Sequence, residues 1–91
     1  MSSIINIPVN FSVEEAIVIR ENAYKMIEAG EKEFLMDFKD CGFVDSTGLG
    51  VMVGIYKKCA ERGGTVTVKN IMPQVRKILE MTRLDKVFEI R

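Results

Sequence analysis

The 91-residue sequence predicts a single small α/β domain, with a mixed sheet of about four strands and about three or more helices packed on one face. Three observations support this prediction. Extended segments alternate with amphipathic segments at helical spacing, the loops between them are short, and 47% of the residues are hydrophobic, enough for a packed core. No repeat, linker or low-complexity tract divides residues 1–91, so we expect one domain.

The first two elements are a strand and a helix. The strand is expected over residues 4–9, where Pro8 confines it to a sheet edge or a strand end. Ser12 and Glu15 form a capping box, which predicts a helix that begins at residue 13, directly after Ser12. Gly30 is a typical residue for the end of this helix.

The rest of the chain continues the alternation of strands and helices. Residues 33–38 are apolar on both faces, which is typical of a central strand. A second helix is expected over about residues 47–62, followed by a β-branched strand over 65–69. Pro73 suits the first turn of a third helix, and a short last strand is expected over 87–90. In the third helix, the residues expected to face the core are Val75, Ile78, Leu79 and Met81.

Composition excludes several functional classes. Thirteen basic residues balance thirteen acidic ones, which leaves no charge excess for nucleic acid or an anionic membrane. Residues 1–8 do not resemble a signal peptide and no apolar stretch reaches membrane-spanning length, so we expect a cytoplasmic protein. There is no histidine, the commonest general base and metal ligand. Cys41 and Cys59 are expected to be buried, reduced thiols.

The block from Asp45 to Gly50, Asp-Ser-Thr-Gly-Leu-Gly, lies where an extended segment ends and the second helix begins. Ser46 directly precedes this helix and is therefore the expected N-cap. Its hydroxyl would lie at the positive end of the helix dipole, beside backbone N–H groups that have no partner within the helix. Such a position serves either as a structural cap or as a site for phosphate. These residues alone leave both interpretations open.

Two glycines of the same helix suggest a surface for another protein. At helical spacing, Ser46, Gly50 and Gly54 project together from the side expected to be exposed. Each glycine inside a helix is about 0.8–1 kcal/mol less favourable than alanine. The pair would form a smooth strip on which a partner could dock closely. A tightly packed helix crossing or neutral drift would give the same pattern.

Known catalytic motifs with similar residues fail on spacing. The aspartic protease motif places glycine two residues after the aspartate, where this chain has Thr47. The serine nucleophile elbow requires glycine two residues before the serine, where this chain has Val44, and no histidine is present to activate Ser46. The phosphate-binding loop lacks its Gly-Lys-Ser/Thr ending, and no cluster of metal ligands exists. We therefore expect neither enzyme activity nor a metal site.

Residues along the middle of the chain resemble a known family. The segments that carry the resemblance are Phe43 to Val51, Tyr56-Lys57 and Gly63-Gly64. They resemble the STAS domain of bacterial anti-sigma factor antagonists, over about residues 34–87. The resemblance implies that Ser46 is the phosphoacceptor, with Thr47 as a weaker alternative. It further implies that the partner is an anti-sigma factor that is also a serine kinase.

The implied regulatory cycle is one of reversible binding. The unphosphorylated antagonist binds the kinase and releases the sigma factor, phosphorylation at Ser46 switches binding off, and a serine phosphatase restores the active form. ATP and metal belong to the kinase, so this chain carries no cofactor. Asp45 would position the hydroxyl or the incoming phosphoryl–metal group. The implied partner-binding residues are Asn10, Asp45, Ser46, Thr47, Gly48, Leu49, Gly50 and Gly54. An alternative is a STAS scaffold or regulatory subunit of another signalling or transporter-associated assembly.

The start of the chain departs from the family pattern. Family members usually begin with an extra strand, followed by a strand that leads into a Gly-x-Leu-Asp-like turn. This chain begins near the second strand, and its turn reads Pro8-Val9-Asn10, with Asn10 near the usual aspartate. One strand is expected to be missing, which leaves a sheet edge free. This predicts a homodimer through the exposed edge.

Overall fold

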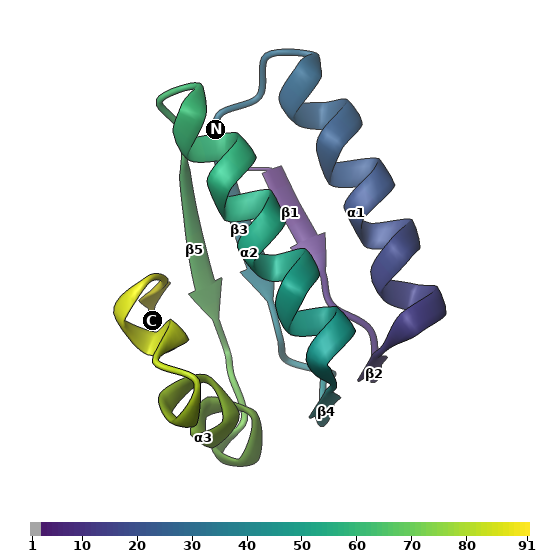
Figure 1. The fold of residues 1–91 in the computed structure, drawn as a ribbon, viewed down its shortest axis with the longest axis vertical. Coiled ribbons are helices and arrows are strands. Elements are labelled where there is room, and N and C mark those ends of the chain that lie inside the picture. Colours follow the sequence, from purple (N-terminus) through teal and green to yellow (C-terminus); the bar gives the residue numbers. More distant parts are fainter. Residues whose placement is uncertain (1–2) are drawn as a thin grey trace.

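The computed structural model describes residues 3–91 and confirms the α/β fold class (Figure 1). The strands are β1 (Ser3–Asn6), β2 (Asn10–Phe11), β3 (Glu33–Asp37), β4 (Phe43–Val44), β5 (Thr65–Lys69) and β6 (Glu89–Ile90). The helices are α1 (Val13–Glu28), α2 (Ser46–Glu61), α3 (Pro73–Met81) and the short 3-10 helix η1 (Leu84–Lys86).

The strands form two parallel sheets. The main sheet has the order β1-β3-β5-β6, and β2 pairs with β4 in a separate two-stranded sheet. Every strand pairing is parallel, so the expected mixed sheet is corrected to a parallel one. The reason is that α1 connects β1 to β3 and α2 connects β3 to β5. Each helix returns the chain to the end of the sheet where the previous strand began, so the next strand runs in the same direction. β3 lies between β1 and β5, which confirms it as a central strand.

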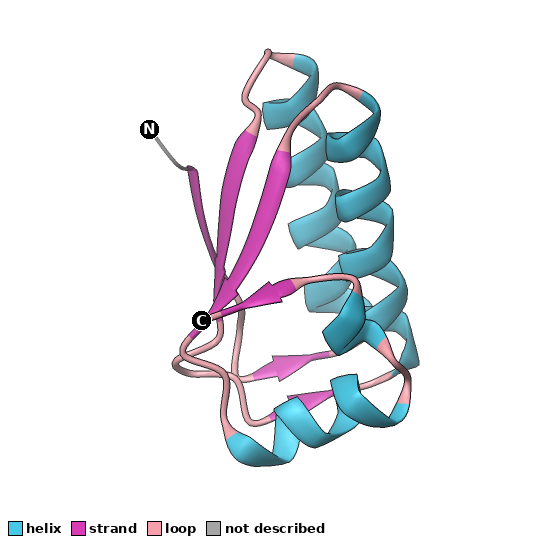
Figure 2. Ribbon diagram, turned by 90° about the vertical axis from the view of Figure 1, so that its left-hand side faces the viewer, coloured by secondary structure: helices cyan, strands magenta, loops and turns pink. Residues whose placement is uncertain are grey.

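The helices do not all lie in one layer. Figure 2 shows α1 and α2 side by side over one face of the main sheet, and no other helix or strand of residues 3–91 covers the opposite face. α3 instead lies across the end of the domain that also holds β2 and β4. Val75 and Leu79 of α3 are buried as expected, but Met81, its last residue, is 76% exposed and does not face the core.

The core fills the space between the main sheet and the two long helices. Alternate strand residues point towards the helices, so Ile5, Met36 and Val68 lie in register and are all buried. Ala16 and Ala23 lie two helical turns apart on α1, and both are small and buried, which suits the close packing of α1 against α2. This core fixes the positions of α1 and α2, and with them the loops that precede the two helices.

Helix α1 begins and ends where the sequence predicts. Ser12 is the N-cap, but its hydroxyl donates to the Glu15 carboxylate at 3.3 Å and makes no hydrogen bond to a backbone N–H. At the other end, Gly30 has φ +101°, the left-handed conformation that glycine adopts easily after a helix. Among residues 3–91, no helix is long and apolar enough to cross a membrane.

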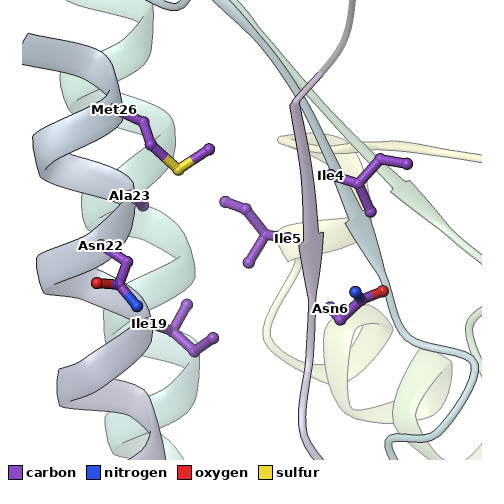
Figure 3. A pocket seen from close by; sticks show the side chains of 7 residues that line it. All are labelled: Ile4, Ile5, Asn6, Ile19, Asn22, Ala23 and Met26. Atoms are coloured by element: carbon purple, nitrogen blue, oxygen red, sulfur yellow. The ribbon is translucent and has the colours of Figure 1, made fainter. Parts of the chain in front are cut away.

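β1 forms one edge of the main sheet, and α1 lies alongside this edge (Figure 1). Between them is a cleft of about 220 Å³ that is lined only by uncharged side chains (Figure 3). The lining residues are Ile4, Ile5, Asn6, Ile19, Asn22, Ala23 and Met26. Within residues 3–91, β1 pairs with β3 alone, and the homodimer through this edge stays a prediction.

Candidate functional site

The segments before α1 and before α2 lie side by side at one end of the domain, beyond the carboxyl ends of the main-sheet strands (Figure 1). In the two-stranded sheet, Asn10 lies opposite Phe43, and Phe11 lies opposite Val44. The N–H of Asp45 then donates to the carbonyl oxygen of Phe11 at 3.3 Å. This ladder brings Asn10 close to the start of α2, although the two are far apart in the sequence.

Asp45, and not Ser46, is the N-cap of α2. Its backbone is extended (φ −98°, ψ −176°), and its Oδ1 accepts a hydrogen bond from the N–H of Gly48 at 2.9 Å. The predicted cap was therefore wrong by one residue. Aspartate caps a helix as well as serine does, and its negative charge is also stabilised by the helix dipole. Ser46 becomes the first residue of α2.

The side chain of Ser46 is exposed at the surface, whereas Thr47 is half-buried. Because Asp45 provides the cap, the Ser46 hydroxyl is not needed to hold the helix end. The N–H groups of the first helical turn point out of the helix end, and the positive end of the dipole lies there. An exposed hydroxyl in this position can accept a phosphate without repacking the core.

Gly48 is buried and cannot form part of an open docking surface. A Cβ atom at this position would stand 2.3 Å from the carbonyl oxygen of Phe11 and 3.1 Å from Cγ1 of Val44. Only glycine allows the first turn of α2 to rest so closely on β2. Leu49 is half-buried against the core. Both residues hold α2 in place, which corrects the expectation that Gly48 shapes a surface.

Gly50 and Gly54 do not form a continuous strip. Gly50 is exposed, and a Cβ atom there would have open space around it. Gly54 faces α1, where a Cβ atom would lie 2.8 Å from the hydroxyl oxygen of Tyr24. The ring of Tyr24 is in turn covered by Lys58, whose Nζ is 4.9 Å from the ring centroid. The prediction that Gly54 projects from the exposed side was wrong, and the alternative of a close helix contact is correct.

Sequence reasoning missed three exposed apolar side chains at this end of the domain. Val9 is 62% exposed, Phe43 is 50% exposed and Val13 is 53% exposed. Phe43 lies opposite Asn10 and one residue before buried Val44. The alternation of a strand would have placed Phe43 on the outer face if the position of β4 had been known. Exposed apolar residues gathered near polar ones are typical of a protein-binding surface.

The described residues offer little other chemistry at this end. Residues 3–91 contain no group of three or more potential metal ligands among His, Cys, Asp and Glu. Both thiols are buried, as predicted, and burial raises the pKa of Cys41 and of Cys59, so neither is an activated nucleophile. The distinctive reactive group is the exposed hydroxyl of Ser46.

Comparison with known proteins identifies relatives over nearly the whole chain. The STAS domain family matches residues 3–91. An anti-sigma-B factor antagonist of Bacillus subtilis (strain 168) is 31% identical over 86 residues, which cover 94% of this chain and 78% of that relative. An anti-sigma F factor antagonist of Paenibacillus polymyxa is 36% identical over 59 residues, and this chain spans only 50% of its length.

A solved structure has the same fold. The crystal structure of a candidate anti-sigma factor antagonist from Thermotoga maritima superimposes with a TM-score of 0.86 at 24% identity, covering 96% of this chain and 75% of that one. At this identity the similarity shows the fold alone. None of these relatives is named as an enzyme, which agrees with the prediction that this chain is not one. The two relatives described above are named as anti-sigma factor antagonists, and the chain belongs to the STAS domain family.

Proposed function

We propose that this protein is a cytoplasmic anti-sigma factor antagonist with Ser46 as its phosphorylation switch. In the unphosphorylated form it binds an anti-sigma factor that is also a serine kinase, and the sigma factor is released. Phosphorylation of Ser46 ends the binding, and a serine phosphatase restores it. The observation that supports this most strongly is that Ser46 is exposed and is not used as the helix cap, although it is the first residue of α2.

The proposed modification needs only a hydroxyl from this chain. Oγ of Ser46 forms a bond to the γ-phosphorus of ATP, which the kinase holds together with its metal ion. The bond from that phosphorus to the β–γ bridging oxygen breaks, ADP leaves, and the hydroxyl proton passes to a base of the kinase. In a separate reaction, the phosphatase transfers the phosphoryl group from Ser46 to water and regenerates the hydroxyl.

The switch acts through charge and solvation without refolding the domain. A phosphate adds about −1.5 to −2 charges beside the carboxylate of Asp45. The helix dipole offsets this by only about 0.3–1 kcal/mol at an exposed helix end. Because Ser46 is exposed, the phosphate can remain in solvent while the monomer keeps its fold. A partner that covers this end would have to desolvate the phosphate, and this disfavours docking.

The surroundings of Ser46 suit a protein partner. Asn10 and Phe43 lie opposite each other in the β2–β4 ladder, and Phe43 is half exposed. Gly50, one helical turn after Ser46, leaves open space over the helix backbone. We propose that the partner contacts this end of the domain through Asn10, Asp45, Ser46, Thr47 and Gly50. Phe43 supplies apolar contact area.

Binding to a purified anti-sigma factor from the same genome tests this proposal. Isothermal titration should give similar affinities for the wild type and Ser46→Ala, because alanine adds no charge to this surface. Affinity should fall at least tenfold for Ser46→Asp and further for the phosphorylated protein. Thr65→Asp, an exposed position at the first residue of β5 and therefore at the amino end of the sheet, controls for added charge alone. Equal affinity of the wild type and both charged Ser46 forms would contradict the proposal.

A further inference from the structure

We infer that Asp45 is a positioning residue for phosphorylation of Ser46, and that it acts through its hydrogen bond to Gly48 and not through its negative charge. This inference rests on the proposed function. From the sequence, Asp45 could position the hydroxyl, or it could attract the phosphoryl–metal group of the kinase. The geometry of the α2 start favours the first of these roles.

Asp45 is attached to its surroundings through three groups. Its N–H donates to the carbonyl oxygen of Phe11 at 3.3 Å, and its own carbonyl oxygen accepts from the N–H of Leu49 at 3.0 Å. Its side-chain Oδ1 accepts from the N–H of Gly48 at 2.9 Å. The first bond ties the residue to β2, and the other two tie it to the first turn of α2. Ser46 is the next residue, so its backbone position is set by these bonds.

Gly48 completes the same arrangement from the helix side. Its Cα rests on the main chain of β2 so closely that a Cβ atom would stand 2.3 Å from the oxygen of Phe11. The Asp45 side chain therefore holds a turn that is packed directly against the strand containing Asn10. If this bond is lost, the first turn of α2 can separate from β2. Ser46 then loses its fixed position relative to Asn10 on the proposed docking surface.

The side-chain oxygen of Asp45 that bonds Gly48 points into the helix turn and is half-buried with its residue. The cap uses one lone pair of Oδ1, and the carboxylate keeps its second oxygen, so the charge and the cap can be separated only by substitution. Asparagine can make the same bond through its own Oδ1 but carries no charge, and the two residues are comparable N-caps. Substitution by asparagine therefore separates the two roles.

The experiment measures phosphorylation by the cognate kinase at limiting substrate for the wild type, Asp45→Ala and Asp45→Asn. Asp40→Ala, an exposed acid that makes no helix cap, is the matched control. We expect kcat/KM to fall in Asp45→Ala by up to about fivefold, since loss of a typical N-cap changes the equilibrium constant of the turn by about that factor. Asp45→Asn should stay within about twofold of the wild type, and Asp40→Ala should be unchanged. Amide exchange at Gly48 should accelerate in Asp45→Ala but not in Asp45→Asn.

Three other outcomes would overturn the inference in different ways. If Asp45→Asn loses as much activity as Asp45→Ala while its Gly48 amide stays protected, the charge is what matters. If Asp45→Ala is phosphorylated as efficiently as the wild type, the cap does not position Ser46. If the wild type itself accepts no phosphate, the proposed function fails, and the inference fails with it.

Discussion

The hydroxyl oxygen of Tyr24 on α1 lies 2.8 Å from the point where a Cβ atom of Gly54 on α2 would stand. The two long helices are therefore packed so that a glycine of one accommodates the tip of an aromatic side chain of the other. A glycine that resembled part of a docking surface is instead part of the internal helix contact.

This contact predicts an interaction between two substitutions. Gly54→Ala alone should change the free energy of unfolding little, because a gain of about 0.8–1 kcal/mol in helix propensity is offset by the overlap with Tyr24. In a Tyr24→Phe background the overlapping oxygen is absent, so the same substitution should stabilise by about 0.5–1 kcal/mol. Urea unfolding of the four proteins measures the coupling. The explanation is wrong if Gly54→Ala has the same effect in both backgrounds.

Alanine substitutions at Gly48 and Gly50 should change the free energy of unfolding in opposite directions. Gly48→Ala should destabilise by about 1–3 kcal/mol, since the new methyl group overlaps the main chain of Phe11 and forces α2 and β2 apart. Gly50→Ala should stabilise by up to about 1 kcal/mol, because the methyl group meets open space and alanine favours the helix. Thermal and urea unfolding test both variants. Similar effects from the two would show that the close contact at Gly48 is not the cause.

Asp37, at the end of β3, predicts a pH-dependent contribution to stability. Its Oδ1 accepts hydrogen bonds from Nδ2 of Asn70 at 3.1 Å and from the N–H of Lys39 at 3.0 Å. Both hydrogen bonds lower the pKa of Asp37 below its usual value, and the bond from Asn70 has the largest effect. The stabilisation should be fully present above the unfolded pKa of about 3.9 and disappear as the pH falls through the lower folded pKa.

Asn70→Gly removes the side-chain donor while suiting the positive φ of 59° at this position. The difference in unfolding free energy between wild type and variant should therefore shrink as the pH is lowered from 7 towards 2. Asp37→Ala should show the same trend. A difference that stays constant with pH would contradict the assignment of the lowered pKa to this hydrogen bond.

The edge strand β1 predicts weak self-association. Ile4 on this strand is 60% exposed, and among residues 3–91 the edge strand spans four residues, with Pro8 shortly after it. So short an edge offers few main-chain hydrogen bonds, so we expect a dimer only at high protein concentration. Ile4→Lys should abolish it, whereas Val18→Lys, 56% exposed on α1, should not. Sedimentation velocity tests this, and a strict monomer at high concentration would count against the prediction.

The sequence predicted those parts of the fold that local patterns encode. The start of α1 follows from Ser12 as the N-cap and from the helical spacing of apolar residues after it. The central place of β3 follows from its apolar residues on both faces. The direction of all the strands and the position of α3 depend on how the elements pack, which a local pattern does not contain.

The site was predicted in outline but not in its internal contacts. The sequence located the start of α2 to within one residue, but Asp45 and Ser46 are both good N-caps, and only the backbone conformation distinguishes them. A helical wheel gave the angles of Gly50 and Gly54 but not the identity of the neighbour, Tyr24, that one of them meets. The roles of Gly48 and Phe43 depend on the β2–β4 ladder, which joins segments far apart in the sequence.

The most direct test of the proposed switch is to incubate the protein with its cognate anti-sigma kinase and ATP, and then to measure intact mass and map the modified residue. We predict one added phosphate, located on Ser46, and no added mass in Ser46→Ala. Phosphate on Thr47 or elsewhere, or no phosphate on the wild type, would contradict the assignment of Ser46 as the switch.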